Sequence, residues 1–265
     1  MLRIRGDGVT VRNLNIRGPW ANQKAATGRV WEPSHYGVHV FEKSANPFVW
    51  CDNFTLETTE INGYSANGLK LTGGAGHQIL NNTIVYNFET AVAVFAADTT
   101  GIKVNGNILS YNGANRLDTC ADYSEYCDNS LDENGWAHDK FPKGGEGQGF
   151  ILNPCKREMK DLLIEGNSIL RSARSAIAFL DDGVGSFNGV DIRNNYLLEN
   201  GTSNPNDNGW GVRFDGSIQN LILEYNDAKL NFSGCYNIPY SGVTVGDNCC
   251  DGQGGSGPWF APCLQ

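Results

Sequence analysis

One six-residue pattern recurs along this chain and limits the folds that it can adopt. The pattern is apolar-x-x-Asn-x-apolar, and seven segments follow it, five of them with Asn at the fourth position. The segments are "VRNLNI" from Val11, "LETTEI" from Leu56, "ILNNTI" from Ile79, "VNGNIL" from Val104, "IEGNSI" from Ile164, "IRNNYL" from Ile192 and "LEYNDA" from Leu223. The five asparagines are Asn82, Asn107, Asn167, Asn195 and Asn226.

A second pattern, small-apolar-x-apolar, follows each copy of the first. It reads "GVHV" at Gly37, "GLKL" at Gly68, "AVAV" at Ala91, "GFIL" at Gly149, "AIAF" at Ala176, "GVRF" at Gly211 and "GVTV" at Gly242. Where insertions are absent the period is 23 to 31 residues, which predicts a solenoid whose rungs bury their apolar side chains only by stacking. Strands of successive rungs would lie about 4.8 Å apart. A stacked Asn can then both donate to and accept from its neighbours.

Composition agrees with a turn-rich all-β protein. Charged residues make up 18% of the chain, and there are 33 glycines. The formal net charge of −9 argues against a nucleic-acid partner, which requires clustered Lys and Arg. No apolar run approaches the length of a membrane span.

The chain has eight cysteines, and their spacing does not match a zinc site. An even number in loop-like segments predicts disulfides and secretion into an oxidising compartment. Cys120 and Cys127 could close one insertion, whereas Cys235, Cys249, Cys250 and Cys263 could staple the C-terminal tail; the pairing stays open. Four Asn-x-Ser/Thr sequons permit N-glycosylation, at Asn53, Asn81, Asn200 and Asn231.

The repeat and its asparagines resemble the right-handed parallel β-helix proteins of the pectate lyase superfamily, over about residues 8–247. We therefore predict an all-β, single-stranded right-handed parallel β-helix (solenoid) of about seven rungs. It forms one domain over residues 1–265, with a Cys-rich C-terminal tail at 248–265. By this resemblance the strand before the Asn turn belongs to a second sheet and the strand after it to a third. The small-apolar-x-apolar strand belongs to a first sheet, which faces a groove walled by the insertions 17–35, 43–53, 110–147, 199–209 and 229–239.

Two columns of side chains are expected to face outward from the first sheet. The middle column is His39, Lys70, Ala93, Ile151, Ala178, Arg213 and Thr244, and the next is Phe41, Thr72, Phe95, Asn153, Leu180, Asp215 and Gly246. Arg213 and Asp215, together with Asp181 and Asp182, would lie at one end of the groove. His39 and Lys70 would lie at the other end.

The resemblance implies a secreted, carbohydrate-active protein that acts on a uronate-containing polysaccharide. A lyase or C5-epimerase of this kind removes the proton next to the carboxylate, and a cation must stabilise the resulting charge. On this interpretation Ca²⁺ is held by Asp181, Asp182 and Asp215, and the catalytic candidates are Arg213, Lys70 and His39. Candidate sugar contacts are Trp210, Trp136, Tyr36, His138 and Asn153.

Two alternatives remain, because no catalytic motif of a member family is complete. A glycoside hydrolase would use Asp181, Asp182 and Asp215 as paired acid and base, and is less favoured than the lyase. A non-catalytic surface, adhesive or filament module is also open, since "MLRIRGDGVTV" begins directly on a rung whose strand edge could associate with another copy. Arg213 with the neighbouring aspartates could equally form a surface salt bridge.

Overall fold

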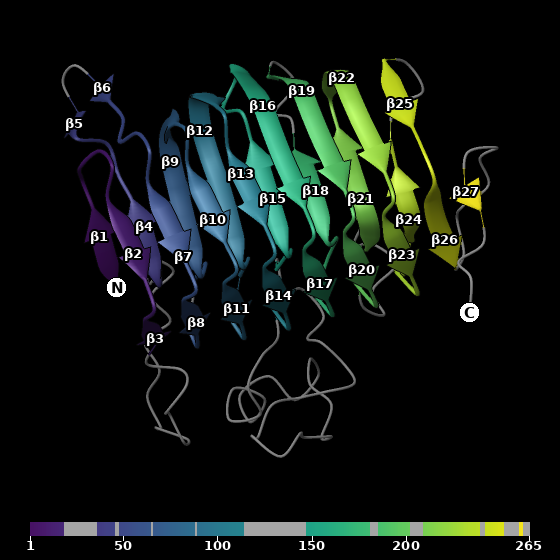
Figure 1. Ribbon diagram of the computed structural model, residues 1–265, viewed down its shortest axis with the longest axis horizontal. Helices are drawn as coiled ribbons and strands as arrows, with labels where there is room; N and C mark the ends of the chain where they lie inside the picture. Colours follow the sequence, from purple (N-terminus) through teal and green to yellow (C-terminus); the bar gives the residue numbers. More distant parts are fainter. Residues whose placement is uncertain are drawn as a thin grey trace.

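The computed structural model describes residues 1–18, 36–45, 48–64, 66–87, 89–113, 147–180, 185–201, 209–238, 242–251 and 260–261. Every regular element in these ranges is a β-strand. The chain winds as a right-handed parallel β-helix whose rungs follow one another along the axis from the N-terminus to the C-terminus, with the strands lying across that axis (Figure 1). The predicted fold class is therefore confirmed.

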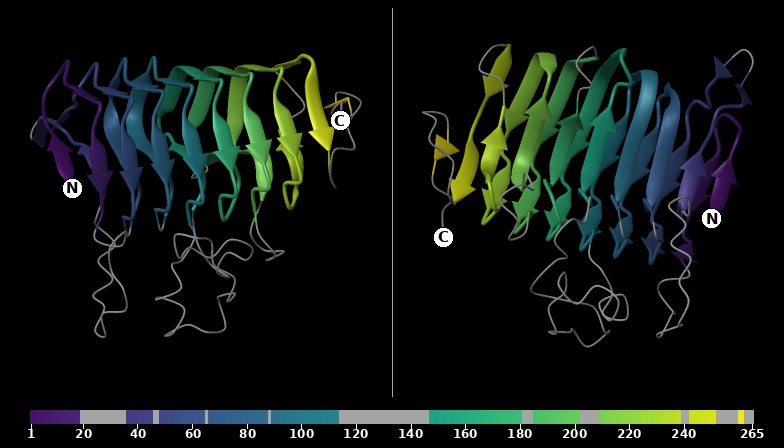
Figure 2. Two further views of the ribbon diagram at one scale, coloured as in Figure 1. Left: turned by 60° about the horizontal axis from the view of Figure 1, so that its bottom comes forward. Right: turned by 180° about the vertical axis from the view of Figure 1, so that it is seen from behind.

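Three sheets run along the axis, and the two views of Figure 2 show their strands side by side from rung to rung. The first sheet contains β1 (Leu2–Ile4), β4 (Val38–Val40), β9 (Leu69–Ala75), β12 (Val92–Thr100), β15 (Phe150–Asn153), β18 (Ile177–Leu180), β21 (Trp210–Asp215) and β24 (Gly234–Asn237). The second contains β2 (Thr10–Arg12), β7 (Thr55–Glu57), β10 (Gln78–Leu80), β13 (Lys103–Asn105), β16 (Glu158–Glu165), β19 (Ser186–Arg193), β22 (Ser217–Glu224) and β25 (Val243–Val245). These two sheets are continuous where Thr100 of β12 pairs with Lys160 of β16.

The third sheet follows the Asn turn of each rung. It contains β3 (Asn15–Arg17), β8 (Glu60–Asn62), β11 (Thr83–Val85), β14 (Ile108–Ser110), β17 (Ser168–Leu170), β20 (Tyr196–Leu198), β23 (Asp227–Lys229), β26 (Asn248–Asp251) and β27 (Phe260–Ala261). Pairing between rungs is parallel throughout the described residues. The predicted insertion 43–53 instead holds the antiparallel hairpin of β5 (Ser44–Ala45) and β6 (Phe48–Val49).

The core is a stack of apolar side chains that point inward from all three sheets. Residues of one register position, such as Val38, Leu69, Val92, Phe150 and Ile177, align from rung to rung and are fully buried. Because strand side chains alternate between faces, the intervening residues point outward. As a result, outward side chains of successive rungs align in columns on the outer face of the first sheet.

The predicted asparagine ladder is confirmed between the second and third sheets. Asn107 Nδ2 donates to Asn167 Oδ1 at 2.9 Å, and Asn167 Nδ2 donates to Asn195 Oδ1 at 2.9 Å. Each ladder residue is buried, and the residue before it is left-handed, as at Asn81 and Asn194 with φ of 55°. Asn or Gly, which tolerate that conformation better than most residues, occupies the position before the ladder asparagine in four of the five copies, and Tyr225 occupies it in the fifth.

A second asparagine ladder, which was not predicted from the sequence, runs from rung to rung at the turn between the third sheet and the first. Asn87 Nδ2 donates to Asn112 Oδ1 at 3.1 Å, and Asn200 Nδ2 donates to Asn231 Oδ1 at 3.0 Å. Each member follows a first-ladder asparagine by five residues, a spacing that is readable in the sequence. Asn200 and Asn231 are 0% and 4% exposed, so two of the four sequons lie inside the fold, while Asn53 and Asn81 are exposed.

The prediction for the C-terminal rung was wrong. "GVTV" forms β25 and lies in the second sheet, where Thr244 pairs with Ile222. The first-sheet position is occupied by β24, whose Asn237 pairs with Arg213, so 229–239 is not a groove wall. Thr244 and Gly246 therefore leave the two outward columns.

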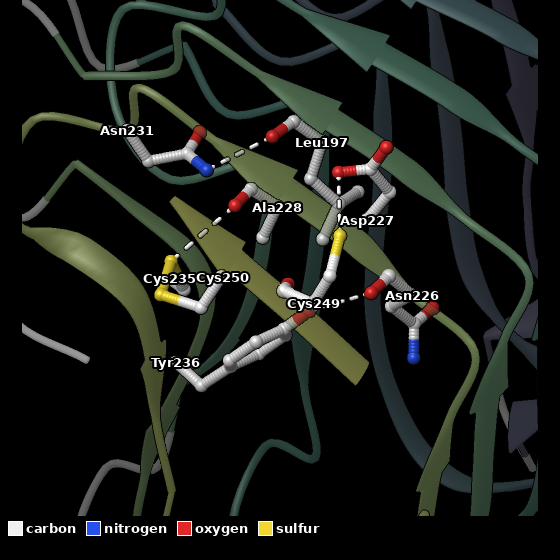
Figure 3. The surroundings of a disulfide bond; sticks show 9 residues. All are labelled: Leu197, Asn226, Asp227, Ala228, Asn231, Cys235, Tyr236, Cys249 and Cys250. Atoms are coloured by element: carbon white, nitrogen blue, oxygen red, sulfur yellow. Dashed lines mark hydrogen bonds between the residues drawn. A yellow bond between two sulfur atoms is a disulfide. The ribbon is translucent and has the colours of Figure 1, made fainter. Parts of the chain in front are cut away.

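A disulfide closes this last rung from inside (Figure 3). Cys235 of β24 points inward from the first sheet and is joined to Cys250 of β26 in the third sheet. Tyr236 Oη lies 3.1 Å from the backbone carbonyl oxygens of both Asn226 and Cys249, and its single hydrogen can be donated to either. The predicted stapling of the tail is thus confirmed for one pair, whereas Cys120, Cys127 and Cys263 lie outside the described residues.

Candidate functional site on the first sheet

The outward middle column of the first sheet is Arg3, His39, Lys70, Ala93, Ile151, Ala178, Arg213 and Asn237. It agrees with the predicted column from His39 to Arg213. Side chains along it form three regions that differ in character. The first is a basic–aromatic cluster (Arg3, Arg5, Tyr36, His39, Phe41, Lys70), the second an apolar floor (Ala93, Phe95, Ile151, Ala178, Leu180), and the third the pair of Arg213 and Asp215.

Three cations of the basic–aromatic cluster lie against aromatic rings. The guanidinium carbons of Arg3 and Arg5 are 5.5 Å and 5.2 Å from the centre of the Phe41 ring. Lys70 Nζ is 4.8 Å from the Tyr36 ring and donates a hydrogen bond to Tyr36 Oη at 3.2 Å. Among the described residues, none of these cations forms a salt bridge. Within the described ranges, an acidic chain therefore concentrates positive charge here without a paired carboxylate, and such charge attracts anions.

His39 is the buried member of this cluster, only 6% exposed. Its ring centre is 3.6 Å from that of Phe41 and 4.7 Å from that of Tyr36. Both ring nitrogens are buried without a hydrogen-bond partner. Burial, followed by the nearby Lys70 and Arg3 charges, lowers the pKa of His39 to about 4, so the ring is neutral at pH 7.

Arg213 and Asp215 form an ion pair at the far end of the sheet. Arg213 Nε donates to Asp215 Oδ1 at 2.9 Å, and Arg213 Nη2 contacts Asp215 Oδ2. Both carboxylate oxygens thus face one guanidinium, the arrangement that the salt-bridge alternative anticipated. The guanidinium charge of Arg213 would repel a dication bound at this carboxylate.

The remaining predicted residues are only partly brought together. Trp210 begins β21 and is half-buried, and Asn153 Oδ1 accepts from the Cys155 backbone at 2.8 Å. Asp181, Asp182, Trp136 and His138 lie outside the described residues, so their roles stay predictions, as do calcium binding and self-association. Among the residues that the structure describes, there is no group of three or more His, Cys, Asp or Glu side chains able to hold a metal ion.

A cavity of about 260 Å³ opens beside the apolar floor. Its floor is Phe95, Ile151 and Leu180, and its edge is Asn67, Glu89, Thr90, Gln148 and Arg174. The sequence analysis missed this edge. Asn67, Thr90 and Gln148 each precede the small residue of the second pattern, which is the signal that would have found them.

Comparison with known proteins leaves the family open. No family model matches the chain, and no curated protein matches it. Among solved structures, QnrB1, a plasmid-mediated fluoroquinolone resistance protein, is similar at 10% identity over 91% of each chain, with a TM-score of 0.22. A similarity at that score carries no argument about this protein. In the part of the chain that the structure describes, no helix has the length and apolar character to cross a membrane.

Proposed function

We propose that this protein binds a uronate-containing polysaccharide along its first sheet and cleaves it by elimination, as a β-helix protein of the pectate lyase superfamily. The observation that carries the proposal is the basic–aromatic cluster: Arg3, Arg5 and Lys70 without acidic partners among the described residues, on a chain with a net charge of −9. Guanidinium groups suit carboxylates because they can form two parallel hydrogen bonds. Aromatic faces suit the C–H surface of sugar rings.

In the proposed reaction Arg3 and Arg5 bind the uronate carboxylate and stabilise the negative charge that develops on it. Lys70, a cation when the uronate binds, first gives a proton to solvent and then takes the proton from the carbon next to the carboxylate. Tyr36, hydrogen-bonded to Lys70, gives a proton to the oxygen that leaves the adjacent ring carbon. One C–H and one C–O bond break and a carbon–carbon double bond forms, so no oxidant or water is consumed.

His39 contributes to the site by staying neutral. A charged imidazolium beside Lys70 and Arg3 would add like-charge repulsion, and burial disfavours it. The ring therefore supports Phe41 and Tyr36. No step is assigned to calcium, because Asp215 is engaged by Arg213. The same pairing disfavours the hydrolase, which would need Asp215 as a free acid or base.

The C-terminal disulfide supports the location that we propose for this activity. Disulfides persist in oxidising compartments and are rare in the cytosol. Cys235 and Cys250 are joined inside the last rung. Secretion to the exterior, where polysaccharides are encountered, is the location that accords with this bond.

The test is ultraviolet absorbance of unsaturated product, measured with pectin, polygalacturonate, alginate and glycosaminoglycans, each with Ca²⁺ and with chelator. We expect one uronan to give product. Lys70→Met should lower kcat by about 10²-fold or more, as for loss of a general base. Arg3→Ala with Arg5→Ala should mainly raise KM. Arg12→Ala, which removes an exposed arginine from the second sheet, is the matched control and should change neither.

Three results would contradict the proposal in different ways. Binding without product on every polymer would make the protein a non-catalytic carbohydrate-binding module. Turnover that survives Lys70→Met would remove the assigned base. Failure of every uronan to bind would refute the first sheet as a uronate site.

A further inference from the structure

The cavity adjoins the basic–aromatic cluster through a shared residue. Lys70 Nζ is 5.6 Å from the centre of the Phe95 ring, and Phe95 also forms part of the cavity floor. Lys70 lies on β9 and Phe95 on the next rung, β12. Rungs are about 4.8 Å apart, which is close to the length of one sugar residue in a chain. A polysaccharide lying along the axis would therefore place neighbouring sugars over the cluster and the cavity.

The two regions differ in charge. The cluster has three cations and no carboxylate, whereas the cavity edge has one charge of each sign, Glu89 and Arg174. A carboxylate that entered the cavity would meet Glu89 as well as Arg174. The cluster thus favours a uronate, and the cavity lacks that preference.

Hydrogen bonds along the cavity edge leave amide donors available. The Thr90 backbone N–H donates to Asn67 Oδ1 at 3.1 Å, and Thr90 Oγ1 donates to Gln148 Oε1 at 3.0 Å. These bonds direct the two amide oxygens toward Thr90. No hydrogen bond among the described residues uses Asn67 Nδ2 or Gln148 Nε2, although the two side chains are 5% and 4% exposed. Amide donors at the edge of a cavity suit hydroxyl or acetamido oxygens of a ligand.

Size and floor agree with a single sugar ring. The volume of about 260 Å³ equals that of about nine water molecules in the liquid, which accommodates one pyranose. Ile151 is 6% exposed and packs with Ala93 and Ala178, and Phe95 and Leu180 pack against them. This apolar surface can receive the C–H face of a ring while its hydroxyl groups reach the amide edge.

We propose that the cavity is a subsite for one uncharged sugar next to the uronate held by the cluster. The preferred substrate is therefore an acidic heteropolysaccharide in which uronate alternates with a neutral or N-acetylated sugar, and not a uronate homopolymer. This inference rests on the proposed function, because it takes the neighbouring uronate from that assignment.

The test is calorimetric binding of size-matched oligosaccharides to the full chain. The probes are an oligogalacturonate, a hyaluronan oligosaccharide, which alternates uronate with N-acetylglucosamine, and a neutral cello-oligosaccharide. We expect the alternating probe to bind at least tenfold more tightly than the homopolymer. Ile151→Trp, which fills the cavity, should abolish this preference. Gln148→Leu keeps the shape of the side chain but removes its amide donor, and it should reduce the preference for the alternating probe. This variant does not require the fold to accommodate a larger side chain.

Ile222→Trp is the matched control, because Ile222 is an outward isoleucine of the second sheet with 38% exposure. It should leave all three affinities unchanged. Equal affinity for the homopolymer and the alternating probe, or equal losses for both in Ile151→Trp, would overturn the inference while leaving the proposed function intact. Failure of both acidic probes to bind, or binding that is unaffected by Arg3→Ala combined with Arg5→Ala, would refute the proposed function itself.

Discussion

Truncation of one ladder asparagine tests whether the repeat stabilises the fold through its side-chain hydrogen bonds. Asn167 Nδ2 donates to Val104 O at 3.0 Å and to Asn195 Oδ1 at 2.9 Å. Its Oδ1 accepts from the backbone N–H of Asn107 at 3.0 Å and from Asn107 Nδ2 at 2.9 Å. Asn167→Ala removes all of these bonds inside the protein. At a net contribution of about 1 kcal/mol per bond, we expect a loss of about 4 kcal/mol in the free energy of unfolding.

The matched control is Asn105→Ala, two residues before the next ladder position. Asn105 faces outward and its Nδ2 donates to Glu165 Oε2 at 3.0 Å, so about 1 kcal/mol or less is expected. Asn167→Thr should fall between the two, because Thr59 occupies the same ladder position in an earlier rung. Urea unfolding followed by circular dichroism measures the differences as shifts of the midpoint. A loss for Asn167→Ala no larger than that for Asn105→Ala would refute the reasoning.

Three further predictions concern stability and modification. Replacing Cys235 and Cys250 together by Ala should lower the free energy of unfolding by about 3 kcal/mol for a disulfide of sequence separation 15; an unchanged thermal midpoint would contradict this. Because the pKa of His39 is lowered from 6.5 to about 4 in the folded protein, the unfolded chain binds more protons than the folded one between these two pH values. The free energy of unfolding should therefore fall by up to about 3 kcal/mol as the pH drops from 6.5 to 4. Urea titrations at both pH values measure this loss, and it should be smaller in His39→Phe. In a glycosylating host, mass spectrometry of the folded protein should find no glycan at Asn200 or Asn231, since a glycan there would break the second ladder.

The repeat made the rungs predictable because each copy contains the physical reasons for its own shape. Alternating apolar residues define the inward face of each strand. The asparagine at the turn follows a residue in the left-handed conformation and forms hydrogen bonds with the asparagine of the next rung. The second ladder follows the same logic at Asn87 and Asn112 and was within reach of the same reading. It lies outside the six-residue pattern, five residues after the first asparagine of each copy.

The error at the C-terminal rung has a different origin. The pattern small-apolar-x-apolar describes any strand with one buried face, so "GVTV" satisfies it equally well in the second sheet. The strand that does complete the first sheet contains Cys235 and Asn237. Its inward cysteine is buried and is joined to Cys250 by the disulfide. Local pattern could not distinguish the two segments.

The sequence by itself determined the parallel β-helix, the order of the rungs and the outward column from His39 to Arg213, because these depend on periodic residues acting within one rung or between adjacent rungs. Only the tertiary structure decided which side chains meet. It buried His39 between Tyr36 and Phe41 and engaged Asp215 with Arg213. It also brought Thr90 to Gln148 across a sequence separation of 58 residues. Such contacts depend on how side chains of different rungs pack and share hydrogen bonds, and the period of the repeat holds no information about that choice.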